Sequence, residues 1–295
     1  MNLTGVLLVT ISCITHSLWN LQAKKKSDQP HFLFWMLVTV SMILAIPSLG
    51  ISLWRPLPLS FWLYGLAAGF CMGVYFYALS TAYLHGDLSL VYPLARATPL
   101  FLLTWTSIVM GVQYDILGYL GIALVVLGTV LLPLFTGSGW KRWLNKGNLW
   151  AVLSAIATCG YSLCDKGAMD VIDQTYQPLI DRSANALVYL WFEFSIGAIS
   201  LLLIYNIIRQ TPSSAQWRLH TRGALPVALL NIFTYGLVLY AMMTNEVLYV
   251  VGFRQLGILF GVFLGITVLK ENQGVVGRIA GAIAITAGLI LIALA

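Results

Sequence analysis

The amino-acid sequence consists of apolar stretches, each long enough to cross a membrane, that follow one another from end to end. An α-helix needs about 20 apolar residues to cross the hydrocarbon core of a bilayer. Only 9% of the 295 residues are charged, whereas a soluble domain carries about a quarter, so this sequence cannot supply a surface for water. We therefore predict an all-α integral membrane protein with ten transmembrane helices. The predicted spans are residues 3–23, 31–53, 58–84, 88–110, 115–134, 147–169, 183–208, 222–244, 247–269 and 274–294.

Matching landmarks occur in the two halves of the sequence. The first span ends with an aromatic residue, a polar residue and a lysine, in the run from Trp19 to Lys24. The sixth span ends with the same pattern, from Tyr161 to Lys166. Each half also closes with a glycine-rich pair of spans, Phe101 to Leu132 and Phe260 to Leu291. These landmarks predict an internal repeat.

The predicted repeats contain five spans each, and an odd number of spans inverts the second repeat in the membrane relative to the first. We predict a first five-helix repeat at residues 1–136, a linker at 137–146 and a second five-helix repeat at 147–295. Inverted repeats are typical of secondary transporters, which bind their substrate between the repeats near the bilayer midplane.

Lysine and arginine residues gather in the odd-numbered loops, while the even-numbered loops hold little beyond Arg55 and Arg182. The positive-inside rule then places the odd loops in the cytoplasm and both termini outside. The net charge of +6 is too small and too scattered to predict nucleic-acid binding. The residues on the odd side are Lys24, Lys25, Lys26, Lys141, Arg142, Lys146, Arg209, Arg218, Arg222, Lys270 and Arg278.

Three sequence motifs resemble those of the drug/metabolite transporter superfamily, in its EamA-type ten-helix branch. The run from Gly86 to Arg96 resembles the motif of the third loop and fourth helix, and the run from Trp19 to Lys24 resembles the motif of the first helix. Leu269-Lys270-Glu271 resembles the Leu-Gly-Glu that ends the ninth helix, with Lys270 in the place of glycine. The resemblance implies transport of small molecules. It also implies that both termini lie inside, opposite to the charge count.

Two arginine residues fall inside predicted spans. A charge at the bilayer centre costs about 2.5–3.5 kcal/mol, so it normally faces a cavity or a partner. Arg96 follows Tyr92 by one helical turn, so the two share a face. We interpret Arg96 as a ligand for an anion, with structural pairing as the alternative. Arg254 lies one residue away from the position equivalent to Arg96, which is Gln255, and this offset turns a helical side chain by about 100°. Its role as a ligand therefore stays open.

The first span carries a polar stripe, since His16, Asn20 and Lys24 recur at four-residue spacing. His16 is either a hydrogen-bond partner of another helix or a proton carrier. Trp19 and its repeat mate Tyr161 either belong to the interfacial belt of aromatic residues or form walls of a substrate site.

Glu193 is a carboxylate well inside the seventh span, on a stripe with Asn185 and Tyr189. It either forms a salt bridge with an arginine of another helix or is a protonatable coupling group, because desolvation favours the neutral form of a carboxyl group. Asp165 and Lys166, by contrast, are expected to form a pair at the membrane interface.

The remaining features are interpreted as mainly structural. Tyr75, Tyr77 and Tyr240 complete the aromatic residues of the central spans, where packing competes with a role in the site. The glycines of the fifth and tenth spans permit close helix contact or a homodimer interface. The four cysteines fall within spans and indicate neither disulfides nor a metal site. Without a metal-ligand cluster, P-loop or nucleophile motif, the sequence predicts neither an enzyme nor a cofactor.

These observations lead to one functional hypothesis and two alternatives. We expect a secondary transporter in the cell membrane, most simply a bacterial inner membrane, that exports a small metabolite with an anionic group, such as an amino acid or a phosphonate-like compound, by alternating access. The alternatives are a flippase for a lipid-linked polar group and a polyspecific exporter of hydrophobic cations. Glu193 and His16 are the candidates for proton coupling. The candidate substrate-binding residues are Trp19, Asn20, Tyr77, Tyr92, Arg96, Tyr161, Tyr240 and Arg254.

Overall fold

The computed structural model describes residues 3–29, 31–96, 115–134, 145–176, 179–245, 250–251, 253–271 and 274–294. All regular elements in these ranges are helical, in agreement with the predicted all-α class. Some predicted features lie outside the described residues, namely residues 97–110 of the fourth span, 137–144 of the linker, and 247–249 and 252 of the ninth span.

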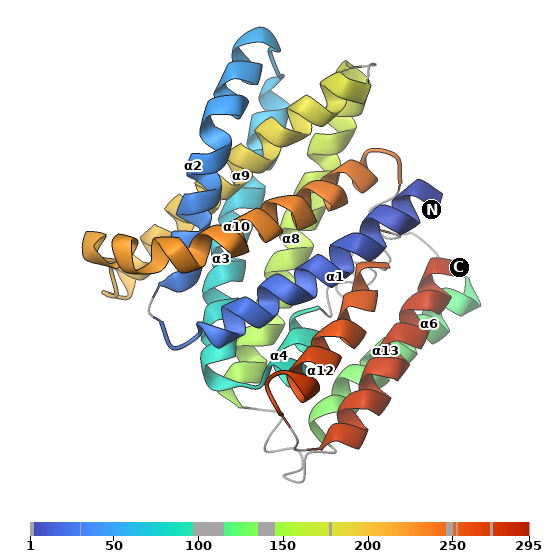
Figure 1. The fold of residues 1–295 in the computed structure, drawn as a ribbon. Coiled ribbons are helices and arrows are strands. Elements are labelled where there is room, and N and C mark those ends of the chain that lie inside the picture. Colours follow the sequence, from blue (N-terminus) through green and yellow to red (C-terminus); the bar gives the residue numbers. More distant parts are fainter. Residues whose placement is uncertain are drawn as a thin grey trace.

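The helices follow the predicted spans along the chain (Figure 1). In the first half they are α1 (Leu3–Lys25), α2 (Phe32–Trp54), α3 (Leu59–His85), α4 (Leu88–Ala95) and α6 (Ile116–Leu134). In the second half they are α8 (Lys146–Thr175), α9 (Leu179–Ile207), α10 (Ser214–Met242), the 3₁₀ helix η1 (Arg254–Leu256), α12 (Gly257–Thr267) and α13 (Val275–Leu294).

Six helices in the described part of the chain are long and apolar enough to cross a membrane. They are α1, α2, α3, α8, and the segments Ile180–Ile207 of α9 and Gly223–Met242 of α10. Shorter apolar helices lie at Ile116–Val125, Arg254–Thr267 and Val275–Gly288. Large apolar side chains also point outward, and Ile46, Leu53 and Trp54 are more than 80% exposed. Such a surface suits lipid rather than water, so the chain is a multi-pass membrane protein.

Several helices extend beyond the predicted limits of their spans, and α8 and α10 do so by the most residues. α8 continues to Thr175, past the predicted end at 169, and α10 begins at Ser214, before the predicted start at 222. Hydropathy marks only the part of a helix that lies in hydrocarbon, while backbone hydrogen bonding continues the helix into its polar flanks. In α8 an i,i+4 ion pair supports this extension, with 2.6 Å between Lys166 Nζ and Asp170 Oδ1.

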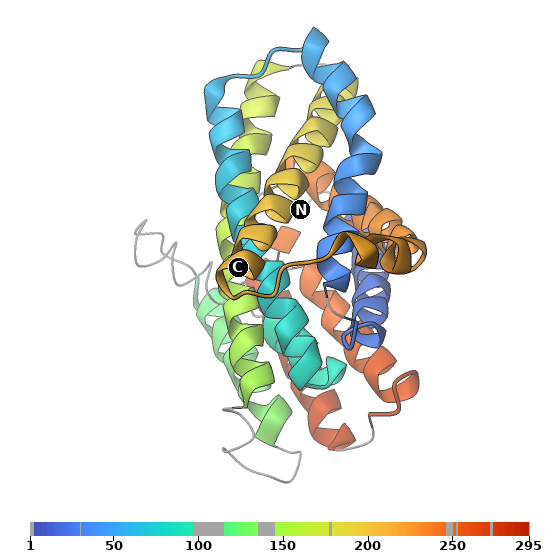
Figure 2. The ribbon, with the colours of Figure 1, turned by 90° about the vertical axis from the view of Figure 1, so that its left-hand side faces the viewer.

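The helices pack in pairs that join the two halves of the chain. α3 packs against α8 and α9, while α2 packs against α9 and α10. α1 packs against α10 and α12, and α4 lies between α8 and α12. α6 pairs with α13 at one side of the molecule, where Figure 1 shows the two side by side. Figure 2 shows that α2, α3, α8 and α9 form the opposite part of the bundle, and that the two ends of the chain lie near one another.

The repeated lysines have similar contacts in the two halves. Lys24 Nζ donates hydrogen bonds to the carbonyl oxygens of Tyr83, at 2.6 Å, and Gly86, at 2.8 Å, at the C-terminal end of α3. Lys166 Nζ lies 3.4 Å from the carbonyl oxygen of Met242, the last residue of α10. A cation is favourable at a helix C-terminus, where carbonyl groups have no helical partner. Each lysine therefore stabilises the end of the third helix of its own half.

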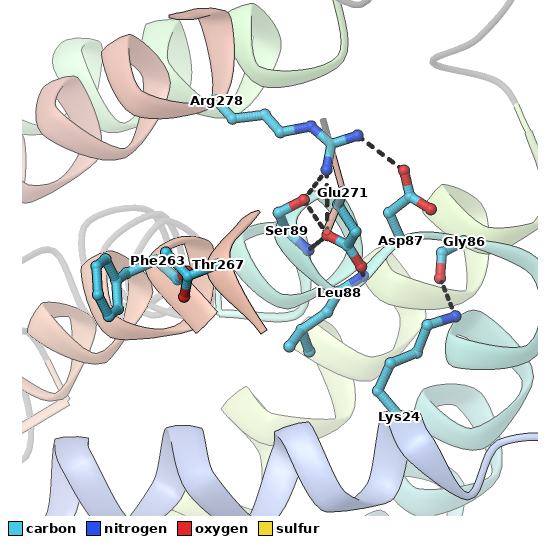
Figure 3. Close-up of polar contacts among 9 residues, drawn as sticks. All are labelled: Lys24, Gly86, Asp87, Leu88, Ser89, Phe263, Thr267, Glu271 and Arg278. Atoms are coloured by element: carbon cyan, nitrogen blue, oxygen red, sulfur yellow. Dashed lines mark hydrogen bonds and ion pairs between the residues drawn. The ribbon is translucent and has the colours of Figure 1, made fainter. Parts of the chain in front are cut away.

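A carboxylate that follows the ninth predicted span caps the start of α4 (Figure 3). Glu271 Oε1 accepts a hydrogen bond from the backbone N–H of Leu88 at 2.8 Å, and Oε2 accepts one from that of Ser89 at 2.9 Å. The first backbone N–H groups of a helix lack intrahelical partners, and the positive end of the helix dipole favours a negative charge there. The structural role of Glu271, in the motif at the end of the ninth span, is therefore to cap the N-terminus of α4.

Arg278 completes this cluster from α13. Its side chain is fully buried, and it forms ion pairs with Glu271, at 3.1 Å, and with Asp87, at 2.7 Å (Figure 3). It also donates a hydrogen bond to the hydroxyl of Ser89. The cluster joins α4 and α13 to the segment that follows α12. Because Arg278 is buried and paired, it differs from the exposed loop residues that the positive-inside rule counts.

Lys270 occupies a backbone conformation that explains the glycine of the family motif. Its φ is 56°, in the left-handed region, where a side chain costs roughly 1–2 kcal/mol and glycine does not. Lys270→Gly should therefore increase the free energy of unfolding by about 1 kcal/mol, measured by thermal unfolding in detergent. Lys270→Ala is the control, because it removes the charge but keeps Cβ. Equal stability of the glycine and alanine variants would contradict this explanation.

Candidate functional site

Two small cavities lie among the buried polar residues, and three residues, His16, Tyr75 and Tyr161, line both. Each has a volume of about 10 Å³, room for at most one water molecule. Small-molecule sites usually measure about 300–1,000 Å³, so the structure shows the site closed. The first cavity is also lined by Trp19, Met72, Phe76, Phe194, Asn231, Thr234, Tyr235 and Arg254. The second is also lined by Asn20, Leu79, Tyr92, Ala95, Arg96 and Thr158.

The two arginines predicted from the sequence lie together at these cavities. Arg96 is 6% exposed and Arg254 is 1% exposed. The guanidinium of Arg96 lies over the ring of Tyr92, 5.6 Å from its centroid, and that of Arg254 lies 5.8 Å from the ring centroid of Tyr235. Within the described ranges neither arginine has a carboxylate within 4.0 Å, and the Nε and Nη2 atoms of Arg254 have no hydrogen-bond partner. Two buried cations therefore face the site without a direct ion pair among these residues, although Arg254 interacts at longer range with Asp165 and Glu193.

Arg254 begins the 3₁₀ helix η1. Its one-residue offset from the position equivalent to Arg96 left open that the two side chains face different directions. In the structure Arg254 lines the first cavity and Arg96 lines the second.

The backbone carbonyl groups around η1 take their hydrogen bonds from other helices. Arg96 Nη2 donates to the carbonyl oxygen of Arg254 at 3.0 Å. From α1, Cys13 Sγ donates to the same oxygen at 3.3 Å, and Ser17 Oγ donates to the carbonyl oxygen of Gly257 at 3.0 Å. Irregular backbone at membrane depth is tolerated where it is buried in protein and its polar groups are satisfied.

The polar stripe of α1 faces the interior. Trp19 Nε1 donates a hydrogen bond to His16 Nδ1 at 3.2 Å, and the two ring centroids are 4.9 Å apart. The hydroxyl of Tyr83 donates to Asn20 Oδ1 at 2.6 Å. Trp19 is 1% exposed and Tyr161 is 3% exposed, so both are buried among helices, which favours a wall over an interfacial belt.

Tyr92 owes its place to two glycines of α12. Its hydroxyl lies 3.3 Å from Ser17 Oγ, and its ring covers Gly261 so closely that an added Cβ would lie 2.6 Å from Tyr92 Cε1. At Gly257 an added Cβ would lie 3.0 Å from the Tyr92 hydroxyl. The small residues of α12 therefore make the space that Tyr92 fills beside Arg96.

The carboxylates of α8 and α9 form a second buried polar group. Asp165 is 1% exposed, and it accepts hydrogen bonds from the hydroxyls of Tyr189, at 3.0 Å, and Tyr235. The predicted interfacial pair of Asp165 with Lys166 is therefore wrong, since Lys166 pairs with Asp170 instead. Consecutive residues of a helix point in different directions, so only one of the two could face the interior. Glu193 is fully buried, and the Tyr235 hydroxyl lies 3.4 Å from its Oε1 atom.

The structure does not bring all the candidate residues together. Tyr77 packs against Trp150 and Tyr205, with ring centroids 5.3 and 5.8 Å apart, away from the two central cavities. Tyr240 is half-buried on α10 and lines neither cavity. Among the described residues no hydrogen bond joins His16 to Glu193. The predicted site is thus centred on Trp19, Asn20, Tyr92, Arg96, Tyr161 and Arg254, with His16 beside them.

A larger cavity of about 580 Å³ lies at the ends of α1, α3 and α9. We call it the vestibule; its polar residues include Lys26, Asp28, His31, His85 and Arg209. Tyr83 lines the vestibule, and its hydroxyl bonds to Asn20, which lines the second central cavity. This hydrogen-bonded pair therefore lies between the vestibule and the second central cavity.

The sequence analysis did not predict several residues of the site, although the helical spacing of one of them indicated it. Asp165 follows Tyr161 by four residues and so shares its helical face. Tyr235 had no comparable signal, because it was one aromatic residue among many on an apolar helix. Phe76, Phe194 and Asn231 also line the first cavity without having been predicted. Among the described residues, no group of three or more histidine, cysteine, aspartate or glutamate side chains could hold a metal ion.

The lipid-facing helices and the buried polar site between them define a multi-pass membrane protein with an internal site. Residues 3–134 match the model of the EamA-like transporter family, which belongs to the drug/metabolite transporter superfamily, so this part of the chain is similar to the family that the motifs indicated. The family transports small molecules across membranes and is generally not enzymatic.

The fold also resembles that of solved structures. One crystal structure of a protein is 19% identical to this chain, with a TM-score of 0.63. The alignment covers 100% of this chain and 98% of the other. Such a likeness shows a common fold alone. No curated protein matches the chain.

The contact between Gly261 and Tyr92 can be tested by adding a methyl group. Gly261→Ala should displace the Tyr92 ring and lower the free energy of unfolding by about 1–3 kcal/mol, as overpacking does. Gly236→Ala is the matched control, because nothing lies within 4 Å of an added Cβ at Gly236 of α10. Thermal unfolding of both variants measures the difference. Equal unfolding temperatures would show that the space at Gly261 is not needed.

Proposed function

We propose that the chain is a secondary transporter of a small polar metabolite with an anionic group, such as an amino acid or a phosphonate-like compound. The observation that carries the proposal is the pair of buried guanidinium groups, Arg96 and Arg254, at the closed cavities and without a carboxylate partner among the described residues. A buried charge without a partner is costly, so a bound anion would supply the missing charge. Export is the direction that the resemblance to the family favours.

The chemistry of the site fits an anion better than a cation. Guanidinium groups bind carboxylate or phosphate through two parallel hydrogen bonds, and the free Nε and Nη2 atoms of Arg254 offer such a pair of donors. Trp19, Tyr92 and Tyr161 would form the walls around the rest of the substrate. Asp165 and Glu193 do not line the cavities, so an acidic site for hydrophobic cations is the weaker alternative.

The packing of the helices supports two inverted five-helix repeats, residues 1–136 and 147–295, joined by the linker. If α1, α2, α3, α4 and α6 correspond to α8, α9, α10, α12 and α13, each major contact has a counterpart in the other half. The contact of α1 with α10 corresponds to that of α8 with α3, and the contact of α1 with α12 corresponds to that of α8 with α4. The contacts of Lys24 and Lys166 follow the same correspondence. Such symmetry is expected of a two-fold repeat.

Alternating access explains why the central cavities are closed while the vestibule is large. The vestibule lies on the side of the odd-numbered loops, which the charge count places in the cytoplasm of the cell whose membrane holds the protein. Its basic residues would attract an anion from that side. A movement that carries Tyr83 and Asn20 aside together would then connect the vestibule to Arg96.

The substrate proposal predicts a loss of function when the guanidinium fork of Arg96 is removed. Arg96→Lys keeps the charge but loses bidentate binding, so substrate affinity should fall about tenfold or more, in line with the roughly 1.5–3 kcal/mol of a hydrogen bond to a charged group. Arg55→Lys is the control, because Arg55 is part-exposed and pairs with Asp181. Transport into proteoliposomes is the measurement. Unchanged affinity in Arg96→Lys would contradict the proposed role.

The substrate class can be found with purified protein and a set of probes. Thermal-shift measurements against amino acids, phosphonates, sugar phosphates and organic cations should show stabilisation by one of the anionic classes, because a ligand that binds the folded state raises its stability. The same ligand should stabilise Arg55→Lys equally and Arg96→Lys less. Stabilisation by organic cations alone would favour the exporter of hydrophobic cations.

We propose that transport is coupled to protons through Glu193. It lies at 0% exposure, where desolvation favours the neutral carboxyl group, and no ion pair to an arginine occurs within the described ranges. Glu193→Gln imitates the protonated state, so this variant should still exchange substrate across proteoliposomes but should no longer respond to a pH gradient. Asp115→Asn, which changes an exposed carboxylate, is the control. Uphill transport by Glu193→Gln at the parental rate would place the coupling elsewhere.

A further inference from the structure

Two buried carboxyl groups share one tyrosine hydroxyl at the junction of α8, α9 and α10. The hydroxyl of Tyr235 bonds to Asp165 Oδ2 and lies 3.4 Å from Glu193 Oε1. Asp165 and Glu193 are 1% and 0% exposed. Two negative charges this close and this far from water would repel each other strongly, and one proton is usually retained by such a pair.

The hydrogen bonds show which carboxyl group keeps the proton. Asp165 has two hydroxyl neighbours that can donate to it, since Tyr189 lies 3.0 Å from its Oδ1 atom and Tyr235 bonds to its Oδ2 atom. Donors to a carboxylate favour its ionised form. A tyrosine hydroxyl has only one proton to donate, so Tyr235 cannot donate to Glu193 at the same time. Glu193 Oε2 has no partner among the described residues, and a neutral Glu193 can donate to the oxygen of Tyr235.

Among the described residues, one positive charge lies near the pair. Arg254 of η1 lies over the ring of Tyr235, 5.8 Å from its centroid, on the side of the first cavity. A single cation can balance a single negative charge on the pair, but not two. The other titratable groups near the pair in this part of the chain are thiols and hydroxyls from α3, α8 and α9, namely Cys71, Tyr161, Cys164 and Tyr189.

We propose that Asp165 and Glu193 form a proton-sharing pair that carries one negative charge, with the proton on Glu193 and the charge on Asp165. Tyr235 connects them: when Glu193 passes its proton to the Tyr235 oxygen, Tyr235 passes its own proton to Asp165 Oδ2, and the negative charge moves from Asp165 to Glu193. Asp165 is thereby a second residue of the coupling site. Its role in coupling rests on the proposed function, whereas the protonation state of the pair does not.

Infrared spectroscopy of the purified protein tests the protonation state without a substrate. In a detergent that has no ester group, at neutral pH, the wild type should show the carbonyl band of one buried, protonated carboxylic acid. Glu193→Gln should lose this band completely, and Asp165→Asn should keep it. Asp115→Asn is the control and should leave the band unchanged. The proposal is overturned if the wild type has no such band, or if the band survives in Glu193→Gln.

Isotope labelling provides a second measurement that needs no variant, in case a substitution at this site prevents folding. Protein with ¹³C-labelled glutamate should show the band shifted to lower frequency, while protein with ¹³C-labelled aspartate should show it unshifted. A shift with labelled aspartate, or with both labels, would overturn the assignment of the proton to Glu193.

Transport data separate this inference from the proposed function. If the carbonyl band is assigned to a glutamate but Glu193→Gln still transports substrate uphill, the shared proton is supported and the role of Glu193 in coupling is contradicted. If Glu193→Gln uncouples transport but the wild type has no band, the coupling role stands and the shared proton is wrong.

Discussion

The site depends on how the backbone around η1 is satisfied inside the membrane. No water is available there to bond the carbonyl groups that a 3₁₀ turn leaves without regular partners. Arg96, Cys13 and Ser17 supply the donors, and in doing so they fix α4 and α1 against the start of α12. The same turn directs Arg254 toward Tyr235. The bilayer requires these carbonyl groups to be satisfied, and side chains from α1 and the end of α4 meet this requirement at the edge of the cavities.

The buried arginines differ in their partners: Arg278 is paired with carboxylates, whereas Arg96 and Arg254 are not. Arg278 has two carboxylates and a hydroxyl as partners, and its cluster joins helix ends at one side of the molecule. Arg96 and Arg254 form no ion pair among the described residues; Arg96 donates to a carbonyl oxygen, and each guanidinium lies over a tyrosine ring. The first arrangement is a structural ion-pair network, whereas the second leaves positive charge directed at a closed space.

Most of the fold could be predicted from the sequence, because apolar length and repeated landmarks are properties of the chain itself. The motif lysines and Arg96 were found in the same way. Asp165 was misplaced because its neighbour Lys166 suggested an ion pair, and only the packing of α8 against α10 decides which of the two faces inward. Tyr235 could not be found at all, since its importance comes from two carboxyl groups on other helices. The 3₁₀ turn that begins at Arg254 is a local feature that no hydropathy pattern reveals.

The contacts of α1 with the end of α3 have a consequence for how such a molecule can move. Lys24 binds the backbone carbonyl of Tyr83, and Asn20, one turn earlier on α1, binds the hydroxyl of the same residue. Tyr83 is therefore held at both ends by one helix. α1 and the last turn of α3 would shift as a rigid unit, and any widening between the vestibule and the cavities would be a hinge movement of this unit against α9 and the start of α2, not a rotation of one side chain.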